Sequence, residues 1–174
     1  MPTTFAHAVA GAALGAGRPG VKTILLTAVC AVHPDADIVA FAFGIPYEHP
    51  LGHRGLTHSL AFAVVVGAAM TALFYRRDSD RLGVFALLTL ATASNGLLDM
   101  LTDGGLGVGL WLPFVDERLF FPVRPIAVSP LGTGVFSARG LAVIANEAVW
   151  VGVPAVVLAA VLYGVRRHRA RRRA

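Results

Sequence analysis

The chain has 174 residues, of which 56% are hydrophobic and 14% charged, and its mean hydropathy is +0.68. Soluble domains carry about 25% charged residues, so this composition argues against an ordinary soluble enzyme and favours a membrane protein. The net charge of +5 does not indicate nucleic-acid binding, because arginines in residues 166–173 account for it directly after an apolar segment, as in cytoplasmic flanks of membrane spans. The alternative is a soluble all-helical protein with a very apolar core.

Apolar segments follow one another with short polar turns between them, at residues 5–16, 21–32, 60–75, 82–101 and 149–165. Residues 102–141 are rich in Gly, Pro and aromatic residues, which predicts an ordered cap or a re-entrant loop. We therefore predict an all-α fold, a multi-pass helical membrane bundle of about four or five apolar helices in which this loop region caps a polar site. Residues 1–165 form the single membrane domain, and residues 166–174 form a basic tail.

Charge is distributed unevenly between the two ends of these segments. Basic residues gather near 18–22, near 76–81 and at the C-terminus, whereas histidines and acids gather at the opposite ends. The positive-inside rule then places the basic C-terminus in the cytoplasm and the polar site on the periplasmic side of a bacterial inner membrane. We expect no cleavable signal peptide, because the N-terminus lacks a basic region.

The stretch 49–59 concentrates polar side chains just before an apolar segment, and it contains His53, Arg54, Thr57 and His58. Histidine is the commonest metal ligand and a proton carrier near neutral pH. His53 and His58 are about 140° apart on an ideal helix, so one continuous helix would not aim both at one point. A loop that ends with Thr57 as the N-cap, with His58 in the first turn, would let them converge.

Two acids, Asp35 and Asp37, follow Pro34 at the end of another apolar segment. Carboxylates at this position either complement a helix N-terminus or bind a metal. A third acid, Asp99, lies on one helical face with Asn95, inside an apolar span. An ionisable residue there is costly and is a candidate functional residue, the alternative being a buried carboxylate that is hydrogen-bonded across the bundle.

These residues predict a metal site with nitrogen and oxygen donors and no thiolate. Such donors suit zinc, with manganese or iron as alternatives, and their number suits one or two divalent ions. The predicted ligands are His7, Asp35, Asp37, His53, His58 and Asp99.

Several nearby residues have predicted roles around this site. Asp37 and His58 would also handle the proton in catalysis. Arg54 would either neutralise a carboxylate or hold an anionic substrate group, and Arg124 is a second such candidate. His33, His49 and Asp103 are weaker candidates, and Glu147 is either a helix cap or a distal ligand.

Three motifs occur in order: Pro34 to Asp37 (PDAD), His53 to Ser59 (HRGLTHS), and Gly96 to Asp99 (GLLD) with Thr102. In these motifs the chain resembles the YdjM-like family of inner-membrane proteins, which are regarded as metal-dependent hydrolases. The resemblance runs from the His7 segment to about residue 132 and implies that the six predicted ligands occupy the family's metal positions. The family is distantly similar to the all-helical zinc-dependent phospholipase C fold, which implies a phosphoester substrate. The sequence pattern of the YdjM-like family usually has His at the position of Asn95 in this chain.

The resulting hypothesis is a membrane-bound, metal-dependent hydrolase that acts on a phosphoester or a lipid-linked ester through metal-activated water. Its expected partners are membrane lipids and a phosphorylated or lipid-linked substrate, with no nucleic acid. The alternative is a non-catalytic metal-binding membrane scaffold or regulatory protein, which Asn95 favours. A transporter that uses the polar stripe of residues 92–102 is a third hypothesis, although the sequence has no inverted repeats to support it.

Overall fold

The computed structural model describes residues 1–130 and 132–172, and this part of the chain is all-helical, with two isolated β-bridges and no β-strand. The α-helices are α1 (Thr4–Gly15), α2 (Val21–Val32), α3 (Leu60–Phe74), α4 (Arg81–Asp99), α5 (Ala138–Glu147) and α6 (Val153–Arg171). The 3-10 helices are η1 (His33–Phe43), η2 (Leu56–His58) and η3 (Gly132–Phe136), and η4 (Ala148–Gly152) is a π-helical turn. The structure confirms the all-α prediction.

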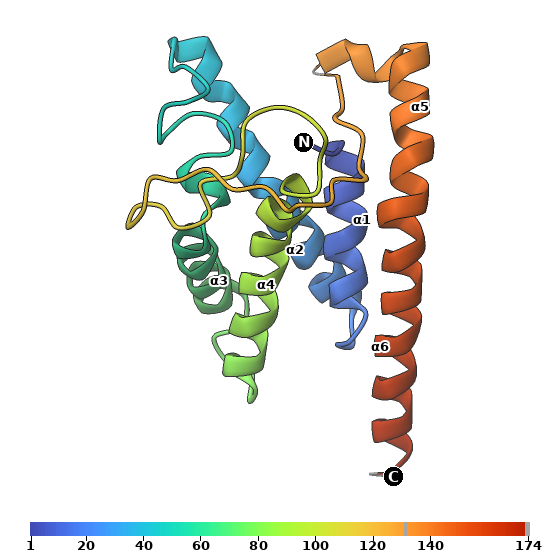
Figure 1. The fold of residues 1–174 in the computed structure, drawn as a ribbon. Coiled ribbons are helices and arrows are strands. Elements are labelled where there is room, and N and C mark those ends of the chain that lie inside the picture. Colours follow the sequence, from blue (N-terminus) through green and yellow to red (C-terminus); the bar gives the residue numbers. More distant parts are fainter. Residues whose placement is uncertain (131, 173–174) are drawn as a thin grey trace.

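Two helical hairpins and one long rod build the molecule. α1 pairs with α2, and α3 pairs with α4 (Figure 1). α5, η4 and α6 run on as a continuous rod that stands beside α1, while the segment between α4 and α5 crosses the end of the bundle that carries the N-terminus (Figure 1). The loop region therefore caps one end of the bundle, as the sequence predicted.

Within the described residues, three helices have the length and composition to cross a membrane: Val21–Phe43, Arg81–Asp99 and Ala138–Arg171. Two of them are longer than the sequence indicated. η1 continues α2 without a break because Pro34 stands at the start of η1, where a missing N–H costs little. The last rod begins after Ser137, whose side chain accepts a hydrogen bond from the Gly140 N–H, so the predicted loop 102–141 ends earlier than expected.

The helix after the histidine stretch has a different cap from the one predicted. Ser59, not Thr57, is the N-cap of α3, and its side chain accepts a hydrogen bond from the Phe62 N–H. Thr57 lies inside η2, two residues before the N-cap position, and its hydroxyl donates to Asp37 at 2.6 Å. His58 therefore ends the short helix η2 just before α3 begins.

The basic turns meet at the end of the bundle away from the loop cap (Figure 1). Arg18 in the α1–α2 turn pairs with Asp78 at 3.1 Å and with Asp80 at 2.7 Å in the α3–α4 turn. Arg166 of α6 donates to the carbonyls of Ala16 and Arg18. Between the two ends lies an apolar core formed by Cys30, Val66, Val84, Leu88 and Ala91.

Candidate metal centre

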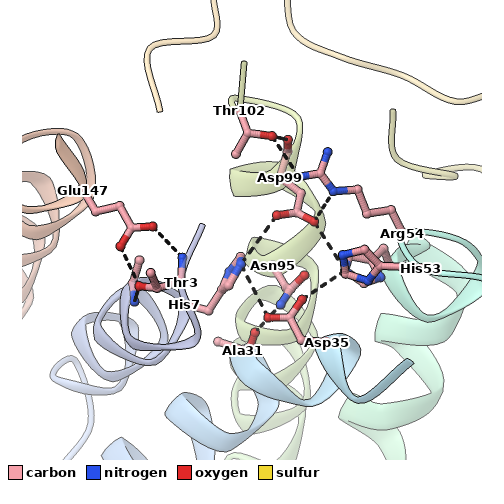
Figure 2. A network of polar contacts seen from close by, with 12 residues as sticks. Thr3, His7, Ala31, Asp35, His53, Arg54, Asn95, Asp99, Thr102 and Glu147 are labelled. Carbon is pink, nitrogen blue, oxygen red and sulfur yellow. Dashed lines mark hydrogen bonds and ion pairs between the residues drawn. The ribbon is translucent and has the colours of Figure 1, made fainter. Parts of the chain in front are cut away.

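Four polar side chains meet beneath the loop cap, and we call them the inner cluster. His7 comes from α1, Asp35 from η1 and His58 from η2, and Asp99 is the last residue of α4. Each is at most 6% exposed. His7, Asp35 and Asp99 point toward one another (Figure 2). Residues far apart in the sequence thus form one buried polar group.

In the inner cluster each carboxylate presents one oxygen to each imidazole. Nε2 of His7 lies 3.7 Å from Asp35 Oδ2 and 3.6 Å from Asp99 Oδ1. Nε2 of His58 lies 3.4 Å from Asp35 Oδ1 and 3.5 Å from Asp99 Oδ2. Hydrogen bonds of this kind are about 2.7–3.2 Å long, so these contacts are too long for them.

The inner cluster leaves its polar atoms without hydrogen bonds. In the described part of the chain, both nitrogens of His7, Nε2 of His58 and both oxygens of Asp35 and of Asp99 lack a hydrogen-bond partner. Asp99 has one charged neighbour, since Arg54 Nε lies 2.9 Å from its Oδ2, but buried polar atoms rarely stay unpaired. The unpaired nitrogen and oxygen atoms of the inner cluster are therefore available to a cation.

The spacing of the inner cluster fits a metal. Ligands at metal bonds of about 2.0–2.1 Å in a tetrahedron stand about 3.3–3.4 Å apart. Asp35, His58 and Asp99 each offer one atom to a group that lies within 4.8 Å, and Nε2 of His58 lies 3.4 Å and 3.5 Å from the two carboxylates. Imidazole nitrogens with carboxylate oxygens suit zinc, manganese or iron. The residues present thus fit the divalent ion that the sequence predicted.

Asp37 and His53 form what we call the outer pair, and Asp37 contacts the other nitrogen of His58. Asp37 Oδ2 lies 3.1 Å from His58 Nδ1, and Asp37 Oδ1 lies 2.6 Å from His53 Nδ1. Asp37 also accepts hydrogen bonds from the Arg54 N–H and the Thr57 hydroxyl. A carboxylate beside Nδ1 favours the tautomer with its proton there, which leaves the Nε2 lone pair free for a metal.

His58 belongs to both candidate ligand groups, Asp35–His58–Asp99 and Asp37–His53–His58. The two groups contain five of the six predicted ligands, with His58 at the junction, and His7 lies beside Asp35 and Asp99 without belonging to either group. Burial by itself lowers the pKa of His58, but the carboxylates of Asp35, Asp37 and Asp99 outweigh it and raise that pKa to about 9. Without a metal, this imidazole therefore carries a positive charge at neutral pH.

The guanidinium of Arg54 is fully buried and bonded within the protein. Its Nε lies 2.9 Å from Asp99 Oδ2, and it donates to the Thr102 hydroxyl and to the carbonyls of Gly104 and Leu106. These contacts orient Asp99 and tie the loop after α4 to the centre (Figure 2). Of the two roles predicted for Arg54, these contacts favour pairing with a carboxylate, here Asp99, and the role in holding an anionic substrate group stays a prediction. Arg124 lies exposed, over the ring of Phe120.

Asn95 lies one helical turn before Asp99 and is fully buried at the base of the inner cluster (Figure 2). Its Nδ2 donates to the Ala31 carbonyl at 2.8 Å, and its Oδ1 has no hydrogen-bond partner among the described residues. The Ala31 carbonyl is free because Pro34, three residues later, has no N–H to donate in the 3-10 helix. The amide is therefore held with its oxygen available to the centre.

Glu147 is a cap for α1, one of the two roles that its sequence position left open. It is buried, and its carboxylate accepts hydrogen bonds from the N–H and the hydroxyl of Thr3 (Figure 2). Thr3 in turn caps α1, which carries His7 one turn later. The link between Thr3 and Glu147 has no signal in the sequence, because it joins the two ends of the chain.

The remaining candidates lie outside this centre. His33 is exposed and stacks on Phe62, and His49 is exposed and accepts a hydrogen bond from the Leu51 N–H. Asp103 is exposed and accepts from the Val128 N–H. None of these three contacts a residue of the inner cluster.

Comparison with known proteins places this chain in a family. The sequence pattern of the family described as YdjM inner membrane protein matches residues 1–171. The chain belongs to the YdjM family. It is also 40% identical over 176 residues to the Inner membrane protein YbcI of Escherichia coli (strain K12), covering 96% of this chain and all of that protein. No solved structure matches the chain.

Membership of the YdjM family confirms the resemblance found in the three motifs. It also confirms the expectation of an inner-membrane protein, in agreement with the three apolar helices. The side of the membrane on which the centre lies stays a prediction from the positive-inside rule.

Proposed function

We propose that this YdjM protein is a metal-dependent hydrolase of the inner membrane that acts on a phosphoester or a lipid-linked ester. One observation carries the proposal: the inner cluster gathers unpaired imidazole and carboxylate atoms at the spacing of metal ligands. His7, Asp35, His58 and Asp99 would hold the metal. A divalent ion bound there lowers the pKa of a water and polarises an ester oxygen.

The arrangement of the two carboxylates supports two ions. Asp35 and Asp99 each offer one oxygen on the side of His7 and the other on the side of His58. Carboxylates that bridge in this way are suited to two-metal centres, whose ions stand about 3.5–4 Å apart. Zinc, manganese and iron all accept these donors.

The chain's own residues prepare the centre. Asp37 and Thr57 hold the Nδ1 side of His58, so that Nε2 stays aimed at Asp35 and Asp99. Arg54 orients Asp99 and balances one of the buried negative charges. Asp37 and His53 together form a hydrogen-bonded pair at which a proton can be held beside the centre.

A second candidate function is a structural metal in a non-catalytic scaffold. His7 and Asp99 are fully buried and come from different helices, so an ion between them would tie α1, η1 and α4 together. Asn95 also supports this function, because a neutral amide stands where the family pattern usually has His.

Metal content and turnover, measured on the full chain purified in detergent, test both functions. We would compare wild type with Asp99→Asn and His58→Ala, using the exposed residues Asp116→Asn and His49→Ala as matched controls. A hydrolase requires bound metal and metal-dependent cleavage of p-nitrophenyl phosphate or lysophosphatidic acid, both lost only in the centre variants. Bound metal without turnover on either ester would support the scaffold. Wild type without metal would overturn both.

A further inference from the structure

Two hollows meet at the start of α1, close to the inner cluster. The first, which we call the head pocket, has a volume of about 240 Å³ and is lined by Asp35, Ile38, Thr4 and Ser129. The second, which we call the tail groove, has a volume of about 300 Å³ and runs between α1 and the α5–η4 segment. Thr3 and Phe5 line both hollows, so the two adjoin.

The head pocket reaches the inner cluster. Asp35, which lines it, presents its oxygens to His7 and His58. Thr4 and Ser129 line the same pocket. The carboxylate of Asp35 makes this lining acidic, so the pocket would complement a phosphate or another acidic ester head when divalent cations are bound at the inner cluster.

The tail groove is apolar along its whole length. Its walls include Ala6 and Val9 of α1, Ile144 of α5 and Val151 of η4. The carboxylate of Glu147 also borders it but is occupied by Thr3. The π-helical turn ends at Gly152, which has no side chain and so leaves the groove open.

We infer that the substrate is a single-chain amphiphile, with its anionic ester head in the head pocket and its acyl chain in the tail groove. The inference rests on the proposed function and names the substrate class of that same centre. A water-soluble phosphoester would need only the head pocket. The tail groove adds an apolar surface that adjoins this pocket. It lies along α1 and the candidate membrane span Ala138–Arg171, and a membrane span is surrounded by lipid acyl chains. Pockets for small ligands measure about 300–1,000 Å³, a range that the two hollows reach together.

Filling the tail groove tests the inference. Gly152→Leu adds a side chain there without a clash, since a Cβ at this position meets only the Glu147 carbonyl oxygen at 3.8 Å. Gly164→Leu is the matched control, the same change in the same rod, where a Cβ meets nothing within 4 Å. Val9→Phe fills the groove from α1, and Val157→Phe on exposed α6 is its control, in case Gly152→Leu fails to fold.

The probe is palmitoyl lysophosphatidic acid, and its retention by the full chain is measured by native mass spectrometry. Each methylene excluded from an apolar site weakens binding about fourfold, so the groove variants should retain the lipid at least about tenfold more weakly than their controls. If turnover is found, cleavage of this lipid should fall in the groove variants while cleavage of p-nitrophenyl phosphate and metal content stay unchanged.

Other results would overturn the inference. Equal retention in the groove variants and their controls would show that the acyl chain binds elsewhere. A wild-type dimer that the groove variants convert to monomer, without a change in lipid retention, would assign the groove to a second copy of the chain. Absence of turnover on every ester would count against the proposed hydrolase, whereas the retention measurement would still decide whether the groove binds the amphiphile.

Discussion

The carboxylate of Asp37 lies 3.1 Å from Nδ1 of His58, on the side of the ring away from Asp35 and Asp99. The imidazole thus stands between a carboxylate that is fully hydrogen-bonded and two that are not. By this difference, Asp37 orients the candidate ligand His58, whereas Asp35 and Asp99 are themselves candidate ligands.

Asp37→Asn should therefore weaken metal binding without removing the site. An amide at this position no longer fixes the His58 tautomer, and loss of such a partner typically costs about 10–100-fold in metal affinity. Asp35→Asn, which changes a predicted ligand, should lose more, and the exposed Asp116→Asn should lose nothing. Competition with a chelator measures all three. Equal losses in Asp37→Asn and Asp35→Asn would make Asp37 a ligand, as the sequence first predicted.

Metal affinity should rise with pH up to about 9. The pKa of His58 is raised from its ordinary value of 6.5 to about 9, so below pH 9 a metal must displace a proton from this imidazole. The affinity should increase by about tenfold per pH unit between pH 7 and pH 9 and then level off. Calorimetry in buffers of different ionisation enthalpy would detect the released proton. A pH-independent affinity across this range would contradict the charged state of His58.

Glu147→Ala should destabilise the fold and weaken metal binding together. The change leaves the buried N–H and hydroxyl of Thr3 without their acceptor, at a cost of about 1–3 kcal/mol in the free energy of unfolding. Because Thr3 begins the helix that carries His7, the imidazole should also lose its fixed position. Glu147→Gln, which keeps one acceptor oxygen, should show a smaller effect. Thermal unfolding and metal titration in detergent check both parts, and a stable variant with normal metal affinity would refute this role.

Arg54→Lys separates a positioning role from an anion-holding role. Lysine keeps the charge but lacks the planar fork that reaches Asp99, Thr102 and the loop carbonyls. For Arg54→Lys we expect a lower thermal midpoint and weaker metal binding. Arg54→Gln should lower the free energy of unfolding by about 3–5 kcal/mol, because Asp99 loses its charged partner. If Arg54 holds the substrate instead, Arg54→Lys should raise KM for an anionic ester and leave the thermal midpoint unchanged.

Much of the fold follows from local patterns in the sequence. The apolar segments, the basic turns and the loop cap all appear in the structure at the ends predicted for them, because hydropathy and turn chemistry act over short ranges. The errors lie at helix boundaries. The continuation of α2 through Pro34 and the capping of α3 by Ser59 depended on contacts such as the bond between Thr57 and Asp37, which join separate segments.

The sequence by itself determined which residue types are available for chemistry, since histidines and acids in an apolar chain are too costly to keep without a role. Only the tertiary structure decided which of these residues are candidate metal ligands and which ones position the ligands. It sets His7, Asp35, His58 and Asp99 around one centre with atoms that lack hydrogen bonds, and it places Asp37 where its carboxylate is hydrogen-bonded and Arg54 where it contacts Asp99 and Thr102. The physical reason is that hydrogen-bond satisfaction depends on which segments meet, and spacing along the chain does not encode that.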